Sequence, residues 1–120
     1  MTQYKSPRLN FLEKLKTKYF FVKDLRYLEI EKGWFDLVEN LCEDILQLDP
    51  PESFEVVQIK QKLGGLRFYT SRVCSGEIEQ LISKAESDSY TICESCSKPG
   101  KKVCPNSYIY VACEECEKTL

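Results

Sequence analysis

The chain has 120 residues, of which 42% are hydrophobic and 30% charged, and its formal net charge is −2. These values are typical of a soluble globular protein with one domain, or with one domain and a small module. No apolar stretch approaches the roughly 18 to 20 residues that cross a bilayer, and residues 1–18 are too polar and basic for a signal peptide. We therefore expect a cytoplasmic protein that has no membrane partner.

Histidine is absent from the chain, whereas cysteine occurs seven times. Without histidine there are no histidine metal ligands, and no cysteine–histidine or serine–histidine pairs for nucleophilic catalysis. Carboxylates that are neighbours in sequence, such as Glu43 and Asp44, do not converge on a substrate, so general acid–base catalysis has no specific support. We expect a protein that is not an enzyme.

Apolar spacing predicts two helices in the first half of the chain. Pro7 suits the first turn of a helix that begins at Arg8. Residues 27–30 are expected to form a short extended segment. The clearest helix covers 34–48, because its apolar residues fall on one stripe and its acidic residues mostly on the other face. The stripe consists of Trp34, Leu37, Val38, Leu41, Cys42, Ile45 and Leu48.

Residues 55–62 and 66–71 are predicted to form a β-hairpin around Gly64 and Gly65. Glycine adopts positive φ angles without steric cost, so this pair suits a two-residue turn. Such a turn places Lys62 opposite Arg67 and Lys60 opposite Tyr69. Alternation along each strand then separates two faces. The core face would carry Val57, Ile59, Leu63, Leu66 and Phe68, and the outer face Gln58, Lys60, Lys62, Arg67 and Tyr69.

The outer hairpin face is a candidate binding surface that consists of Lys60, Lys62, Arg67 and Tyr69. Basic residues interleaved with an aromatic ring suit contacts to phosphates and stacking on bases. Two alternatives remain open: the face is merely solvated, or the acidic helix 34–48 neutralises it. Residues 33–55 contain seven acidic and no basic residues, whereas residues 56–72 contain four basic and no acidic ones.

Ser75 is predicted to cap a third helix, and the cysteine-rich segment follows that helix directly. The inner face of the helix would carry Ile78, Leu81, Ile82, Ala85 and Ser89. We expect an α+β core over residues 1–90 and a zinc-ribbon module over residues 91–120, packed on the core.

Two cysteine pairs predict one structural zinc ion per chain, bound by Cys93, Cys96, Cys113 and Cys116. Two residues between the cysteines of each pair let one tight turn bring both sulfurs to a metal, and sixteen residues between the pairs suit a strand that leaves and returns. Four thiolates leave no open coordination position, so the site would be structural. The alternatives are buried cysteines without metal and a redox dithiol.

Three cysteines lie outside the two pairs. Cys104 could compete as a ligand, although the adjacent Pro105 favours a spare thiol in a loop. Cys42 fits the apolar stripe of its helix as ordinary core. Cys74 lies at a helix start, where thiolates are favoured, but no partner for it is evident.

Several motifs together resemble a family of small, largely uncharacterised zinc-ribbon proteins of phages, prophages and bacteria. The motifs are Gly33-Trp34, Leu41-Cys42, the stretch from Val57 to Tyr69 with its Lys-x-Lys-x-Gly-Gly-Leu-Arg-Phe-Tyr pattern, and the two cysteine pairs. Members commonly have phenylalanine in place of Leu63 and a Gly-Trp-like step before the second cysteine pair, where this chain has Tyr108-Ile109-Tyr110. The resemblance implies a phage or prophage source and no particular activity.

The sequence thus predicts an α+β fold in which helices pack on a small antiparallel β-hairpin or sheet, with a C-terminal four-cysteine zinc ribbon. The expected function is that of a non-enzymatic, zinc-stabilised protein that binds a host macromolecule, with a host protein as the partner and a host defence system as the target. The alternative is a nucleic-acid or nucleotide binder that uses the basic hairpin face.

Overall fold

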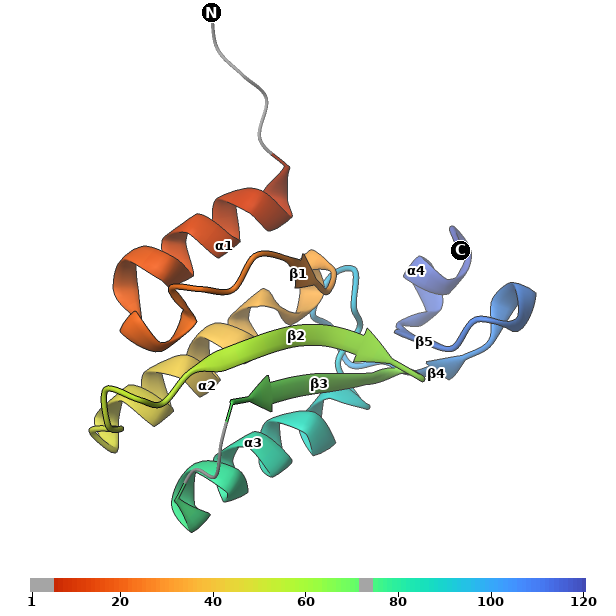
Figure 1. The fold of residues 1–120 in the computed structure, drawn as a ribbon. Helices are drawn as coiled ribbons and strands as arrows, with labels where there is room; N and C mark the ends of the chain where they lie inside the picture. The colour runs from red at the N-terminus through yellow and green to blue at the C-terminus, as the bar shows by residue number, and fades with distance from the viewer. Residues whose placement is uncertain (1–5, 72–74) are drawn as a thin grey trace, which may run out of the picture.

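The computed structural model describes residues 6–71 and 75–120, and it confirms the α+β fold (Figure 1). The helices of the core are α1 (Pro7–Lys18), α2 (Phe35–Gln47) and α3 (Gly76–Ser89). One sheet contains β1 (Leu28–Glu29), β2 (Val56–Lys62) and β3 (Gly65–Thr70). Short 3₁₀ helices, η1 (Phe20–Val22) and η2 (Lys32–Trp34), precede β1 and α2. No helix in the described part of the chain is long and apolar enough to cross a membrane.

Helix α1 begins at Pro7, one residue before the predicted start, and Ser6 is its cap. The Ser6 hydroxyl accepts a hydrogen bond from the backbone N–H of Leu9 at 3.1 Å, and Pro7 occupies the first turn. The buried side of the helix packs on α2, where the rings of Phe11 and Phe35 stack with centroids 4.3 Å apart. This packing attaches the first helix to the core.

Helix α2 confirms the predicted amphipathic helix, and two of its acidic residues contact α1 and Tyr19, the residue that follows α1. Val38, Leu41, Cys42 and Ile45 are buried in the core. The Glu39 carboxylate forms ion pairs with Lys14 at 3.2 Å and with Lys18 at 3.4 Å. The Tyr19 hydroxyl donates to Glu43 at 2.9 Å. Glu39 and Glu43 are therefore compensated from the N-terminal segment rather than from the hairpin.

The sheet is mixed rather than purely antiparallel. Strands β2 and β3 form the predicted hairpin, but β1 pairs with β2 in parallel, with Leu28 beside Ile59 and Glu29 beside Lys60. The expected extended segment 27–30 is therefore the third strand of the sheet. Its pairing could not be predicted because a parallel partner is joined by a long crossover, here containing all of α2.

The predicted hairpin turn was wrong by one residue. The turn consists of Leu63 and Gly64, whose φ angles are 54° and 80°, while Gly65 already belongs to β3. Lys60 therefore lies opposite Arg67, and Lys62 lies opposite Gly65. Gly65 is required for another reason: a Cβ atom there would lie 2.6 Å from the Tyr90 hydroxyl oxygen, so the glycine allows a close approach.

Two apolar residues assigned to the core face by the sequence are exposed instead. Leu63 is 61% exposed because it lies in the turn, and Val57 is 50% exposed because the register shifts between Val56 and Gln58. This bulge turns Val56 inward in place of Val57. The buried face of the hairpin consists of Val56, Ile59, Leu66 and Phe68.

Helix α3 confirms the third predicted helix and covers the outer edge of β3. Its cap is the predicted one, since the Ser75 hydroxyl accepts from the backbone N–H of Ile78 at 3.2 Å. On the edge, the backbone N–H of Leu66 donates to the buried Ser89 hydroxyl at 2.9 Å, and that of Phe68 donates to Glu86 at 3.1 Å. Side chains of the helix therefore bond N–H groups that β3 directs away from β2.

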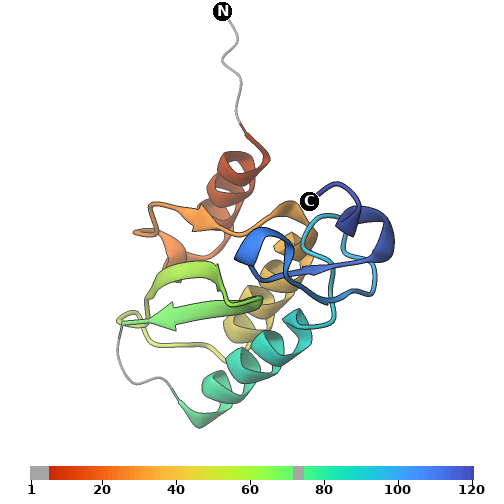
Figure 2. The same cartoon turned by 90° about the vertical axis from the view of Figure 1, so that its right-hand side faces the viewer.

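The sheet is thus covered on one face and open on the other. Helices α2 and α3 lie behind the sheet in Figure 1, α1 lies beside β1, and no described helix crosses in front of β2 and β3. The cysteine-rich segment adjoins the end of the sheet where the hairpin turns, as the rotated view in Figure 2 shows. One apolar core joins all three core helices, the sheet and Val111 from the C-terminal segment.

Candidate metal centre

The C-terminal segment contains a second, two-stranded sheet that brings the two cysteine pairs together. Strand β4 (Lys101–Val103) runs antiparallel to β5 (Tyr110–Ala112), with the 3₁₀ helix η3 (Pro105–Ser107) between them and the short helix α4 (Glu114–Glu117) after them. The first pair of cysteines precedes β4 and the second follows β5. Because antiparallel strands return to the end from which they start, both pairs lie at one end of this sheet.

The four predicted ligands form one cluster. The sulfur atoms of Cys93, Cys96, Cys113 and Cys116 all lie within 4.8 Å of one another. Those of Cys96 and Cys113 are 3.6 Å apart. A tetrahedral zinc site with Zn–S bonds of about 2.3 Å has sulfurs about 3.8 Å apart, so the cluster has the size that a single zinc ion requires.

Each cysteine pair is closed by a tight turn of its own backbone. In the first, the N–H of Ser97 donates to the carbonyl of Cys93 at 3.0 Å, and Ser97 adopts a left-handed φ of 72°. In the second, the N–H of Cys116 donates to the sulfur of Cys113 at 3.5 Å. The two turns therefore hold the sulfurs of each pair close together.

The pKa values of the clustered thiols are consistent with a site for a cation. Burial raises the pKa of Cys93, but backbone N–H groups of Cys113, Ser95 and Cys96 outweigh it and lower this pKa to about 7. Hydrogen bonds with the neighbouring thiols of Cys113 and Cys96 raise the pKa of Cys116 to about 12. Four thiolates this close would repel one another, and a bound divalent cation removes that repulsion. The donor set therefore fits a closed, structural zinc site, with no position left for a substrate.

The first cysteine turn is anchored directly on the start of α2. The backbone N–H of Gly33 donates to the carbonyl of Glu94 at 2.7 Å, and the Ser97 hydroxyl donates to the carbonyl of Gly33 at 2.7 Å. The indole N–H of Trp34 donates to the carbonyl of Ile92 at 2.8 Å. A Cβ atom at position 33 would lie 2.2 Å from the carbonyl oxygen of Cys93, so only glycine allows this contact.

Glu94 is the buried polar residue that joins the hairpin to the cysteine-rich segment. It is 3% exposed, and its carboxylate accepts from the backbone N–H of Val111 at 2.7 Å and from the Gln61 amide at 3.2 Å. The same amide donates to the carbonyl of Ile109 at 2.7 Å. Burial raises the pKa of Glu94, and these hydrogen bonds oppose the shift. Sequence reasoning missed Gly33, Gln61 and Glu94 as anchors, because only the fold brings them together.

The remaining cysteines lie away from the cluster. Cys104 is exposed at the start of η3 and outside the group of four sulfurs. Cys42 is fully buried, and burial raises its pKa to about 12, as expected for a core thiol. Cys74 lies outside the described residues.

The candidate binding residues Lys60, Lys62, Arg67 and Tyr69 all lie on the open face of the sheet. Their alternation with the buried residues of β2 and β3 places them opposite the face that α2 covers. Within residues 6–71 and 75–120, neither lysine forms an ion pair. Arg67 is partly buried and donates to the Tyr90 hydroxyl at 3.3 Å. The structure therefore does not show the acidic helix α2 neutralising this face.

Two further residues of the open face escaped the sequence analysis. Glu29 lies beside Lys60, because β1 pairs with β2. Tyr27, the residue before β1, is 71% exposed, and continuing the parallel register by one residue places it level with Gln58. In the sequence, the alternation of Tyr27, Leu28 and Glu29 indicates that the two outer side chains share one face of a strand. Which face of which sheet they share becomes clear only once the parallel pairing is known.

No protein-family model matches the chain, and no curated protein or solved structure matches it either. The resemblance to phage and prophage zinc-ribbon proteins therefore rests on the sequence motifs. The four-cysteine cluster near the C-terminus is the part of it that the structure supports.

Proposed function

We propose that the chain is a zinc-stabilised, non-enzymatic binding protein that contacts a macromolecule through the open face of its three-stranded sheet. The observation that carries this proposal is the uneven covering of the sheet. Helices cover one face and flank both edges, while the other face presents Lys60, Lys62 and Tyr69 to solvent. Within residues 6–71 and 75–120 the two lysines form no ion pair, and a sheet face that combines such charges with an exposed ring suits recognition.

Two features support a role without catalysis. The chain has no histidine to act as a base near neutral pH. Four sulfur ligands would saturate a zinc ion, so that the metal would hold the fold rather than activate a substrate.

The partner that we propose is a macromolecule of a host cell, and the outcome is interference with a host process such as antiviral defence. The resemblance to phage and prophage proteins supports this proposal. A host protein and a nucleic acid are the two partner classes that the open face could accept, and the unpaired state of Lys60 and Lys62 in the described part of the chain favours an anionic one.

Photo-crosslinking from two positions tests which surface makes the contact. A photoreactive amino acid replaces Tyr69 on the open face in one variant, and Glu79, which is exposed on α3, in a matched control variant. In host lysate we expect a discrete adduct from position 69 and none from position 79. Adducts from neither position, or equally from both, would remove the support for the open face.

A further inference from the structure

An aromatic row crosses the open face of the sheet. Tyr69 lies opposite Gln58, and continuing the parallel register of Leu28 with Ile59 by one residue places Tyr27, the residue before β1, on the other side of the same glutamine. The tyrosines at positions 69 and 27 are 39% and 71% exposed. Neighbouring strands lie about 4.8 Å apart, so the two tyrosines stand about 10 Å apart on one surface. This spacing lets each ring stack on a different planar group.

A basic row runs beside the aromatic one. Lys60 and Arg67 face each other on β2 and β3, and Lys62 follows toward the turn. Beyond the turn, the ammonium group of Lys102 lies 4.3 Å from the centre of the Tyr90 ring. Glu29 is the only acidic residue in the three strands. The open face is therefore locally basic even though the whole chain carries a net charge of −2.

The helical side of the molecule has the opposite character. Helix α2 contains four acidic residues and no basic one, and α3 contains four acidic residues and one lysine. The open face is therefore more basic than α2 and α3, and a polyanion is attracted to it more strongly than to these two helices.

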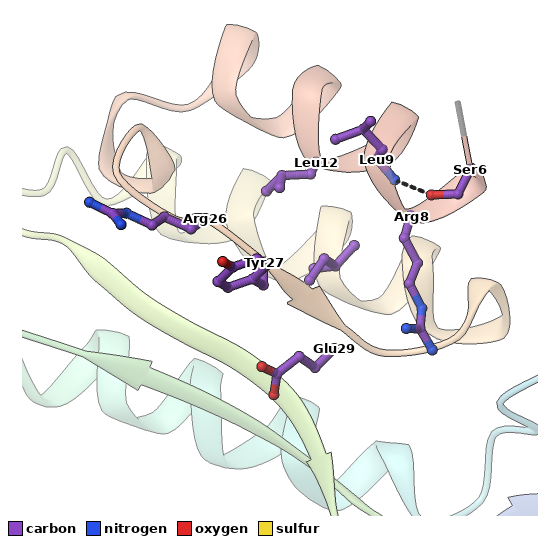
Figure 3. A pocket seen from close by; sticks show the side chains of 8 residues that line it. Ser6, Arg8, Leu9, Leu12, Arg26, Tyr27 and Glu29 are labelled. Atoms are coloured by element: carbon purple, nitrogen blue, oxygen red, sulfur yellow. Dashed lines mark hydrogen bonds between the residues drawn. The ribbon is translucent and has the colours of Figure 1, made fainter. Parts of the chain in front are cut away.

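The aromatic row leads to a pocket between α1 and β1. Figure 3 shows Tyr27 and Glu29 on one side of it and Leu9 and Leu12 on the other. The pocket has a volume of about 300 Å³, and the exposed Arg26 also lines it. It combines apolar walls with the guanidinium groups of Arg26 and Arg8, of which Arg8 forms an ion pair with Glu31.

We propose that the open face binds single-stranded nucleic acid, with bases stacked on Tyr69 and Tyr27 and phosphates beside Lys60 and Lys62. The strand would end at the pocket beside Arg26. An aromatic ring can stack on any base, so stacking does not depend on the nucleotide sequence. The lysines would contact the phosphates of the nucleic-acid backbone. A duplex is disfavoured, because its bases are already stacked on each other and the helices that could enter its major groove are acidic. This inference rests on the proposed function and names its partner class.

Binding of defined oligonucleotides to the zinc-loaded full chain tests this inference. The probe is a fluorescent DNA strand of about 12 nucleotides, compared with RNA of the same sequence and with the matching duplex, by anisotropy over a range of salt. We expect the single strands to bind at low salt, with affinity falling steeply as salt rises, and the duplex to bind about tenfold more weakly.

Substitutions separate stacking from general charge attraction. Tyr27→Ala and Tyr69→Ala should each weaken binding about tenfold, whereas Tyr→Phe at either position should retain it. Lys60→Gln should weaken binding and lower the salt slope by about one, and Glu29→Gln should strengthen binding. The matched control is Lys84→Gln, which removes the same charge from α3 and should change nothing.

Two results would overturn the inference. One is the absence of single-strand binding at low salt by folded, zinc-loaded protein. The other is equal weakening by Lys60→Gln and Lys84→Gln with no effect of the tyrosine variants. If either occurs while position 69 still crosslinks to a host protein, the nucleic-acid inference fails and the proposed function stands. If position 69 gives no adduct as well, both fail.

Discussion

Leu63 holds a backbone conformation that suits asparagine or glycine better than leucine. Its φ of 54° lies in the left-handed region, which costs a residue such as leucine roughly 1–2 kcal/mol. The side chain is 61% exposed, so little burial offsets that cost. With Gly64 at φ 80°, the turn has the geometry in which an Asn-Gly pair is preferred.

Replacing Leu63→Asn should therefore raise the free energy of unfolding by about 0.5–1 kcal/mol, measured by urea denaturation. Leu63→Ala keeps the unfavourable φ and serves as the control, with stability near that of the parent chain. A loss of stability in Leu63→Asn would mean that the leucine side chain contributes packing at this turn.

Cys42 and Cys104 should differ sharply in reactivity. Burial raises the pKa of Cys42 to about 12 and shields its sulfur, whereas Cys104 is exposed. In folded, zinc-loaded protein at neutral pH, iodoacetamide should modify Cys104 well before Cys42, as followed by peptide mass spectrometry. In urea with a chelator both should react at similar rates. Early modification of Cys42 in the folded protein would indicate that α2 opens readily.

The sequence predicts the cluster of four cysteines better than it predicts the hairpin register. The two Cys-x-x-Cys spacings indicate which four sulfurs come together, and the structure brings those four together. Gly64 and Gly65 each permit a turn, so sequence alone could not decide between two registers. In the structure Gly65 lies in β3 and leaves room for the Tyr90 hydroxyl from the end of α3, a contact that the sequence alone does not reveal.

At the scale of elements, the first cysteine turn and the start of α2 are packed so closely that a change in one should destabilise the other. Gly33 is enclosed by backbone atoms of Cys93 and Glu94, which cannot move aside as a flexible side chain would. The Gly33→Ala change should therefore lower the free energy of unfolding by about 2 kcal/mol or more and accelerate zinc release. Urea denaturation and zinc transfer to a colorimetric chelator measure the two effects.

Gly76→Ala is the matched control for that change. Gly76 begins α3, and a Cβ atom there meets nothing within 4 Å. Alanine should leave zinc release unchanged and stability equal or slightly higher. Equal behaviour of the two variants would show that the turn does not dock on α2 as closely as the hydrogen bonds indicate.

Helices were easier to predict than the third strand for a physical reason. The amphipathic period of α2 and the capping serines of α1 and α3 are local signals. Strand β1 has two residues, too few for a period, and its partner lies beyond α2. The sheet face that we propose for binding, which depends on Tyr27, was therefore only partly visible in the sequence.

At the scale of the whole molecule, the metal centre and the core should respond to each other. Trp34 is the only tryptophan and is fully buried, and its indole N–H bonds the carbonyl immediately before Cys93. Purified protein should contain one zinc per chain.

Chelation should shift the Trp34 emission to longer wavelength and lower the melting temperature, because zinc binding energy is folding energy at such sites.

Adding zinc back should reverse both changes, and Cys104→Ser should respond as the parent chain does. Cys116→Ser should show the shifted emission from the start. Unchanged emission after complete metal removal would mean that the turn stays docked on α2 without its ion.

Helix α3 also has a consequence for assembly. Many sheets recruit partners, or copies of themselves, by adding an extended strand along a free border. Here the Ser89 hydroxyl and the Glu86 carboxylate already accept from the outward N–H groups of β3. A strand from another chain would have to displace α3 before it could form backbone hydrogen bonds with the edge of β3. Strand exchange and fibre growth are therefore disfavoured on this side, and a partner meets side chains rather than main chain.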